Sequence, residues 1–169
     1  FRSYSTNSGG SWTAGSGSSF TVAAGTYSIG QVQARQTDLA GNLSNASNSF
    51  AAFSVDIFAA APSLSLAADT GASSSDRLTS NASIAISGLE AGASWEYSSN
   101  SGTTWTAGTG SSFTVTAGSY STGQVQARQT DLAGNLSPAF TSFAAFTVDT
   151  SAAAPTLSLA ADTGASSSD

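Results

Sequence analysis

Short segments in which apolar and polar residues alternate cover much of this chain. In residues 124–130, Val125 and Ala127 alternate with polar side chains, and Ile84 and Ile86 alternate in the same way. A period of two is typical of a strand with one buried face and one face in water. No segment shows the apolar spacing of an amphipathic helix. The pattern therefore predicts an all-β protein built from one-sided antiparallel sheets.

Turn residues divide residues 57–149 into short segments at intervals of roughly eight to twelve residues. We expect strands at residues 63–66, 82–87, 94–98, 104–106, 112–115, 124–130 and 142–148. About seven short antiparallel strands in a unit of about 93 residues are typical of an immunoglobulin-like β-sandwich. The side chains expected in its core are Trp95, Tyr97, Trp105, Phe113, Phe146 and Val148.

The sequence repeats itself at a constant offset of 93 residues, so that Trp12 corresponds to Trp105 and Asp56 to Asp149. Without any gap, roughly 59 of the 76 residues at 1–76 are identical to those at the matching positions further along the chain. Self-similarity at a fixed period indicates a tandem repeat of one folding unit.

The 93-residue offset predicts that the chain contains parts of three successive repeats. Residues 1–56 are the C-terminal part of one immunoglobulin-like repeat, residues 57–149 are a complete repeat, and residues 150–169 are the first strand and following loop of the next. The first and last parts cannot complete one another, because neither contains a counterpart of residues 77–93. We expect their order to depend on neighbouring repeats or on neighbouring copies of the chain.

Composition removes most catalytic functions. The chain contains no Cys and no His, so it lacks the usual zinc ligands, a thiol nucleophile and the base of a Ser-His-Asp triad. Outside the aspartates, only Glu90 and Glu96 could form a carboxylate pair, and we expect both to be solvated surface residues. We therefore do not expect an enzyme.

Charge and hydropathy limit the kinds of partner that the chain could bind. Four Arg against ten acidic residues give a net charge of -6, which disfavours a nucleic-acid partner. The apolar stretches are shorter than the roughly 20 residues that span a bilayer, so we expect no membrane insertion.

The aspartates carry the most informative pattern, because all eight lie at four positions of the repeat. The pairs are Asp38 and Asp131, Asp56 and Asp149, Asp69 and Asp162, and Asp76 and Asp169. In the predicted strand order, the loop 69–76 and the strand exit at Asp149 lie at one end of a repeat, and the loop 131–135 lies at the other. Head-to-tail stacking would therefore bring carboxylates of one repeat close to those of the next.

Converging carboxylates are costly unless a cation neutralises them, and hard oxygen ligands suit Ca²⁺. The absence of His and Cys disfavours zinc and copper. The alternative is that these aspartates only close turns, since Asp readily forms Asx turns. Neither an EF-hand loop nor the glycine-rich nonapeptide calcium repeat is present.

Two kinds of aromatic residue recur at fixed places in the repeat. Trp12 and Trp105 could stack on a sugar, but a sandwich poor in large aliphatic residues favours placing its aromatics inside. Tyr27 and Tyr120 precede the sixth strand of the repeat, where a tyrosine corner would bond the backbone.

Three runs, at residues 84–105, 123–137 and 148–169, include the motifs TDLAGN and DTGASSSD. Together they resemble the immunoglobulin-like repeats in the extender regions of giant, type I-secreted, calcium-dependent bacterial surface adhesins. The resemblance covers the whole chain and implies secretion and Ca²⁺ bound at and near the junctions between repeats. The ligands that it implies are Asp69, Asp76, Asp131, Asn135 and Asp149, with the repeat counterparts Asp38, Asn42, Asp56, Asp162 and Asp169.

These observations favour a structural protein: a calcium-stiffened extender, stalk or filament repeat of a bacterial cell-surface adhesin, outside the cell, with roles in cell adhesion and biofilm. Its partners would be neighbouring repeats of the same chain and neighbouring copies in a filament. The first alternative is a calcium-dependent glycan-binding module, which an accessible Trp105 would favour. The second is a subunit that assembles laterally into a surface layer or sheath.

Overall fold

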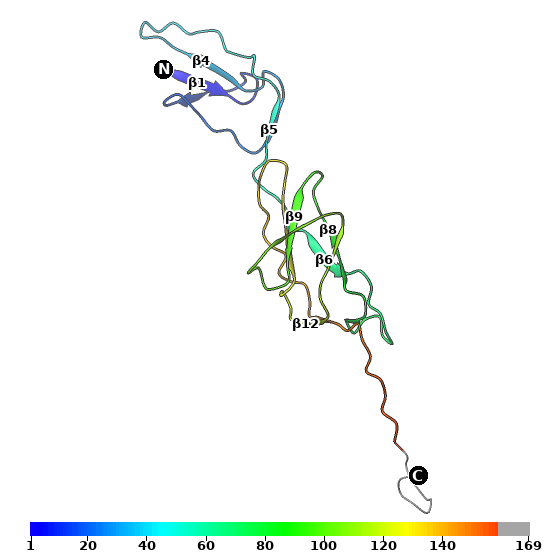
Figure 1. Cartoon of the computed structure of the whole chain (residues 1–169). Coiled ribbons are helices and arrows are strands. Elements are labelled where there is room, and N and C mark those ends of the chain that lie inside the picture. Colours follow the sequence, from blue (N-terminus) through cyan, green and yellow to red (C-terminus); the bar gives the residue numbers. More distant parts are fainter. Residues whose placement is uncertain (159–169) are drawn as a thin grey trace, which may run out of the picture.

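The computed structural model describes residues 1–158, and all regular secondary structure in that part is β. Figure 1 shows two groups of strands that follow one another along the chain, β1 to β5 and then β6 to β14. Residues 1–158 contain no helix long and apolar enough to cross a membrane. The prediction of an all-β protein with small antiparallel sheets is confirmed.

The second group of strands forms three small sheets, in the orders β11-β8-β6, β10-β9-β13 and β12-β14-β7. Its strands are β6 (Ser63–Leu66), β7 (Leu78–Thr79), β8 (Ser83–Ser87), β9 (Ser94–Ser98), β10 (Thr106–Gly108), β11 (Ser112–Thr114), β12 (Gly118–Tyr120), β13 (Gln126–Thr130) and β14 (Phe146–Val148). Within these sheets the pairings are antiparallel, apart from the parallel pairing of β7 with β14.

The apolar faces of these three sheets meet in one core. Its buried members are Leu64, Ile84, Ile86, Trp95, Phe113, Val115, Tyr120, Val125, Ala127, Phe143, Phe146 and Val148. Aromatic stacking between Tyr97 of β9 and Phe113 of β11, with ring centroids 4.1 Å apart, joins two of the sheets, and Tyr120 and Phe146 stack at 4.8 Å across the β12–β14 pairing within the third. Burial of each large apolar side chain contributes roughly 1.5–3 kcal/mol, so a few aromatics compensate for the scarcity of Leu and Ile.

The first group of strands forms the sheets β2-β1-β4 and β3-β5. Its strands are β1 (Arg2–Ser5), β2 (Thr13–Gly15), β3 (Gly25–Tyr27), β4 (Gln33–Gln36) and β5 (Phe53–Val55). Their registers match those of the second group at the 93-residue offset, since Arg2 pairs with Gly15 and Trp95 pairs with Gly108. Equal local sequence thus produces equal local pairing wherever both partner strands are present.

Each strand predicted in residues 57–149 overlaps an observed strand, although several ends are shifted. Two observed strands, β7 and β12, were not predicted. Both are very short, and both pair with the distant strand β14. Each segment is too short for an alternation of apolar and polar residues to predict a strand.

Most of the predicted core residues are buried, but the prediction for Trp105 is wrong. Trp95, Phe113 and Phe146 lie in the core, whereas Trp105 is only half-buried and is no part of the core. The Arg128 guanidinium lies over the Trp105 ring, 4.0 Å from its centroid. A cation stacked on the ring covers its face without placing the ring inside.

Candidate functional site

The linker that leaves β5 is bound at its backbone by side chains of the following strands and loops. Asn135 Nδ2 donates to the Asp56 carbonyl oxygen at 3.1 Å. The Ala60 amide donates to Glu90 Oε1 at 2.9 Å, and the Ala60 carbonyl accepts from Gln129 Nε2 at 2.8 Å. We call Asn135, Glu90 and Gln129 the linker clamp. They come from three separate segments, so the folded second group determines the path of the linker.

Gln129 is the buried centre of the linker clamp and has no exposed surface. Besides Ala60, its Nε2 donates to the Gly88 carbonyl at 3.1 Å, and its Oε1 accepts from the Glu90 amide at 2.8 Å. A buried amide whose donors and acceptor are all satisfied specifies one local geometry. Gln129 was not among the predicted core residues, although the period of two that places Ala127 inside places Gln129 on the same face.

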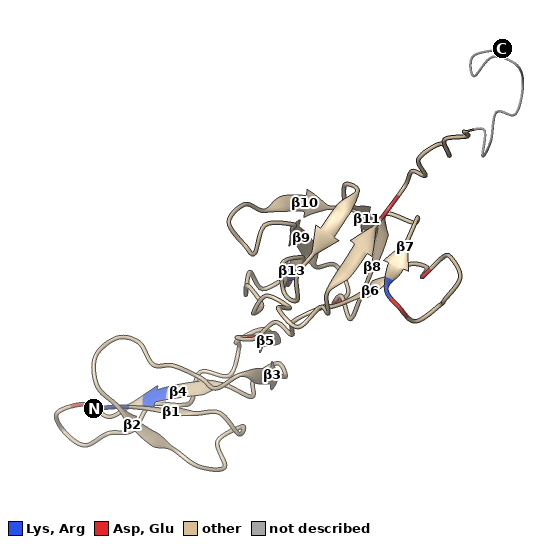
Figure 2. Cartoon of the chain, turned by 90° about the horizontal axis from the view of Figure 1, so that it is seen from below, with Lys and Arg blue, Asp and Glu red and all other residues tan. Residues whose placement is uncertain are grey.

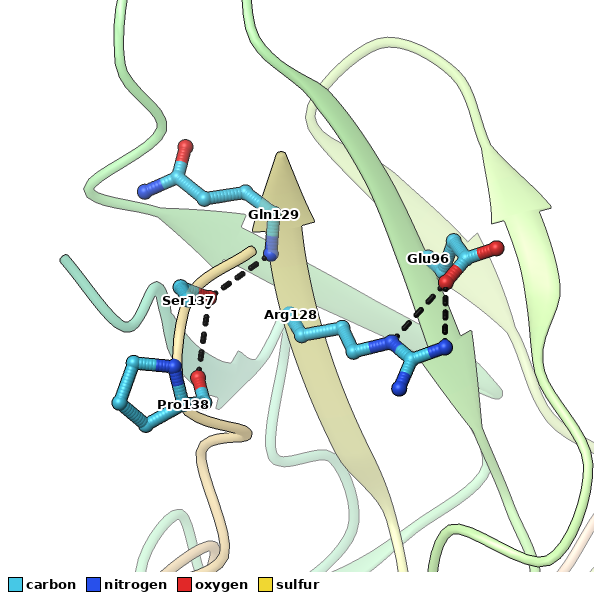
Figure 3. A network of polar contacts seen from close by, with 5 residues as sticks. All are labelled: Glu96, Arg128, Gln129, Ser137 and Pro138. Atoms are coloured by element: carbon cyan, nitrogen blue, oxygen red, sulfur yellow. Dashed lines mark hydrogen bonds and ion pairs between the residues drawn. The ribbon is translucent and has the colours of Figure 1, made fainter. Parts of the chain in front are cut away.

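Glu90 and Glu96, predicted to be solvated surface residues, are partly exposed, and each also makes a specific contact. Glu90 accepts the Ala60 amide, and Glu96 forms an ion pair with Arg128 at 2.9 Å. Figure 3 shows Arg128 and Gln129 extending to opposite sides of β13, with Arg128 reaching Glu96. The cause is the register, which sets Arg128 directly opposite Glu96 in the β9–β13 pairing.

Asp131 and Asn135 close the loop 131–135 through two hydrogen bonds. Asp131 Oδ1 accepts the Asn135 backbone amide at 2.8 Å, and Oδ2 accepts Asn135 Nδ2 at 2.7 Å. The side-chain hydrogen bond from Asn135 holds the pKa of Asp131 below its usual range. Asp38 and Asn42 repeat this geometry at 2.8 Å and 2.9 Å, and the pKa of Asp38 is lowered for the same reason.

Asp69, Asp76 and Asp149 lie at one end of the second group. Asp69 Oδ2 accepts the Arg77 amide at 3.0 Å, and Asp76 Oδ1 accepts the amide two residues later at 3.0 Å. The Asp149 amide donates to the Thr79 carbonyl at 2.9 Å, which places the strand exit beside the end of the 69–76 loop. Figure 2 shows acidic positions in red beside β7, along a chain that is otherwise largely uncharged.

One oxygen of Asp69 is left without compensation. Oδ1 is buried and has no hydrogen-bond partner within residues 1–158. An unsatisfied buried acceptor costs on the order of 1–3 kcal/mol, and more when it is charged. A bound cation would compensate it, and carboxylate oxygens are ligands that Ca²⁺ accepts. This one oxygen of Asp69 therefore has the chemistry of the calcium ligand that the resemblance implies.

The structure brings together only part of the predicted ligand set. Asn135 links Asp131 to the Asp56 carbonyl, so three predicted ligands meet at the linker. Asp162 and Asp169 lie outside the described residues. In the described part of the chain, no three acidic side chains converge into a group that could hold a metal ion. A cation there would need backbone, amide or water oxygens in addition to carboxylates.

The predicted tyrosine corners are confirmed in both copies. The Tyr120 hydroxyl donates to the Thr116 carbonyl at 2.9 Å, and the Tyr27 hydroxyl donates to the Ala23 carbonyl at 3.0 Å. Each tyrosine is buried, and its hydroxyl is used in a hydrogen bond to the backbone four residues earlier. These residues have a structural role and carry no chemistry of a site.

No protein-family model matches this chain, and no curated protein matches its sequence. The indications of function are therefore confined to the residues and contacts of the chain itself. The two features that bear on it most directly are the linker clamp and the unpaired oxygen of Asp69.

Proposed function

We propose that this chain is a structural repeat, which sets the spacing and direction of neighbouring repeats in a stalk or filament on a bacterial cell surface. In this proposal each 93-residue unit is an immunoglobulin-like β-sandwich and residues 57–149 are one complete unit. The resemblance to repeats of giant adhesins supports the setting outside the cell and the roles in adhesion and biofilm. The absence of His and Cys supports a protein without enzymatic activity.

The observation that carries the proposal is the linker clamp. A free linker would let consecutive units bend independently of one another. Here Asn135 binds the linker at Asp56, and Glu90 and Gln129 bind it at Ala60. Because these hydrogen bonds hold backbone atoms, they restrict the direction in which the linker joins the second group.

We further propose that Ca²⁺ reinforces this junction. Two acceptor oxygens, Asp131 Oδ2 and the Asp56 carbonyl, converge on the single Asn135 amide at 2.7 Å and 3.1 Å. The two ends of an amide group are nearly the same size, so turning it over would present a third oxygen beside them. Calcium bound by such oxygens would supply the positive charge that joins the loop to the linker.

The loop 69–76 is the second proposed calcium position. Its support is the unpaired Oδ1 of Asp69 and the presence of Asp76 and Asp149 at the same end. A following repeat docked at this end would bring its own counterpart of Asp131 to these carboxylates. Calcium at every junction would then stiffen the whole array.

The test is thermal melting of the full chain in millimolar Ca²⁺ and in excess chelator, together with small-angle scattering. We expect calcium to raise the melting temperature, since a ligand that binds only the folded state stabilises it by mass action. Asp131→Asn should remove the junction part of that gain, while Asp38→Asn, at the matching position of the first group, should retain it. Scattering should show a longer, straighter particle with calcium.

If neither the melting temperature nor the scattering profile changes with calcium, the proposed calcium role is contradicted. The aspartates would then be turn formers, in agreement with their hydrogen bonds to nearby amides. Glycan binding and lateral assembly would become the next functions to test.

A further inference from the structure

One five-residue sequence takes different structures in the two copies of the repeat, the first copy being the first group of strands and the second copy the second group. Residues 18–22 and 111–115 both read Ser-Ser-Phe-Thr-Val. In the second copy, Ser112–Thr114 form β11 and pair with β8. In the first copy, the matching residues 19–21 form no strand. Because the local sequences are identical, the partner strand makes the difference.

Beside this unpaired segment lies an open apolar groove of ≈ 410 Å³. Its apolar lining includes Phe20, Val22, Val32, Phe50 and Phe53. Phe20 is 41% exposed and Phe50 is 58% exposed, whereas their counterparts Phe113 and Phe143 are 8% and 4% exposed. A contiguous patch of exposed aromatic rings marks an interaction surface.

The second copy shows what covers this surface. There, Leu64 of β6 and Ile84 and Ile86 of β8 pack into the same core as Phe113 and Phe143. β6 and β8 pair antiparallel with each other, and β8 also pairs with β11. Neither strand contains a charged residue, and the groove is likewise lined by uncharged residues. The cover is therefore an uncharged strand pair with an aliphatic inner face.

We propose that the groove of the first group is a docking site for a strand pair of this kind, a segment with the sequence of residues 57–93 of the repeat. Docking would add the β8-type strand to the unpaired edge at residues 19–21, with aliphatic side chains inserted between the exposed aromatics. In residues 1–158, no strand pairs with residues 19–21. This interaction requires no calcium and so stands or falls separately from the proposed function.

The second copy also supplies the register of docking. β11 pairs with β8 so that Phe113 lies opposite Ile84 and Ser112 lies opposite Ala85. Ser19 of the groove would accordingly lie opposite Ala85 of the docked segment. Flanking hydrogen bonds mark this as a pair of the closer kind, with Cα atoms about 4.5 Å apart, a separation that a disulfide can bridge.

The experiment is a register-specific crosslink. The full chain carrying Ser19→Cys is mixed, in a glutathione redox buffer without calcium, with a synthetic peptide of residues 57–93 carrying Ala85→Cys. The natural chain has no cysteine, so each disulfide product has one identity. We expect this peptide to exceed an off-register peptide carrying Ser83→Cys by about tenfold in crosslinked product, because strand pairing raises the local thiol concentration.

Matched variants separate docking from random oxidation. A chain carrying Ser112→Cys, whose β11 already pairs with β8, should yield no more product than the off-register peptide. Phe20→Asp combined with Ser19→Cys should remove the excess by placing a charge in the groove. Ile84→Asp in the peptide places the charge on the other side of the contact, so it should also remove the excess while the groove is unaltered. Equal yields from the two registers, or an excess that survives Ile84→Asp, would overturn the proposal.

Discussion

Asp131 shows how one neighbouring side chain sets the charge behaviour of a carboxyl group. Its low pKa comes first from the Asn135 side-chain hydrogen bond, so Asn135→Ala should raise the pKa of Asp131 toward the usual value of roughly 3.9. NMR titration of the carboxyl carbon measures this directly. An unchanged pKa in the variant would show that the backbone amides hold the carboxylate by themselves.

The same bond makes stability depend on pH. A carboxyl group whose pKa is lowered in the folded state stabilises the fold above its unfolded-state pKa, and loses that effect as pH falls through the folded-state pKa. The difference in melting temperature between the natural chain and Asn135→Ala should therefore shrink as pH falls below about 4. Asn42→Ala is the matched control, since it removes the same bond from Asp38 without touching the linker.

Gln129 is the residue on which the linker clamp depends most. Gln129→Leu would leave the Ala60 and Gly88 carbonyls without their donor, and we expect the free energy of unfolding to fall by about 2–3 kcal/mol. Gln36→Leu changes the matching residue of the first group, which is exposed, and should cost less than about 0.5 kcal/mol. Urea unfolding followed by tryptophan fluorescence measures both, and equal effects would contradict the clamp.

At the scale of elements, the hairpin of β9 and β10 packs more tightly than its counterpart in the first group. A Cβ added at Gly108 would overlap the Trp95 ring, whereas one added at Gly15 would meet its nearest neighbour at 3.7 Å. Gly108→Ala should thus destabilise the fold by about 1–3 kcal/mol, and Gly15→Ala should leave stability nearly unchanged. Thermal melting of the two variants provides the comparison, and equal shifts would count against it.

Strands were most clearly predicted where apolar and polar residues alternate over a long enough segment to be recognised. β8 and β13 have alternating buried positions, and both were predicted from Ile84, Ile86, Val125 and Ala127. β7 and β12 escaped because their pairing with β14 is a long-range contact that short segments do not encode. Trp105 was misplaced because its ring face is covered by the Arg128 guanidinium of β13, a contact between distant segments that the sequence pattern does not encode.

For the whole molecule, the two copies should differ in protection from hydrogen exchange. The Val115 amide donates to the Ala82 carbonyl at 3.0 Å, while the matching amide of Val22 has no backbone acceptor among the described residues. We expect Val115 to exchange slowly and Val22 to exchange close to the unprotected rate. Gly30 and Gly123, which donate to matching carbonyls in both copies, are internal controls. Equal protection at the two valines would mean that the first group closes in another way.

Sequence was sufficient for features that repeat locally: the all-β class, the 93-residue period, the aspartate positions and the tyrosine corners. Alternation and turn chemistry act over a few residues, and the 93-residue self-similarity is a property of the sequence itself, so no tertiary contact is needed to recognise them. Tertiary structure alone decided which identical segment became a strand, as residues 18–22 and 111–115 demonstrate. It likewise brought Asn135 and Gln129 to the linker, because those contacts join residues about 70 to 80 positions apart. A strand needs a partner and a clamp needs two distant surfaces, and only the folded chain supplies them.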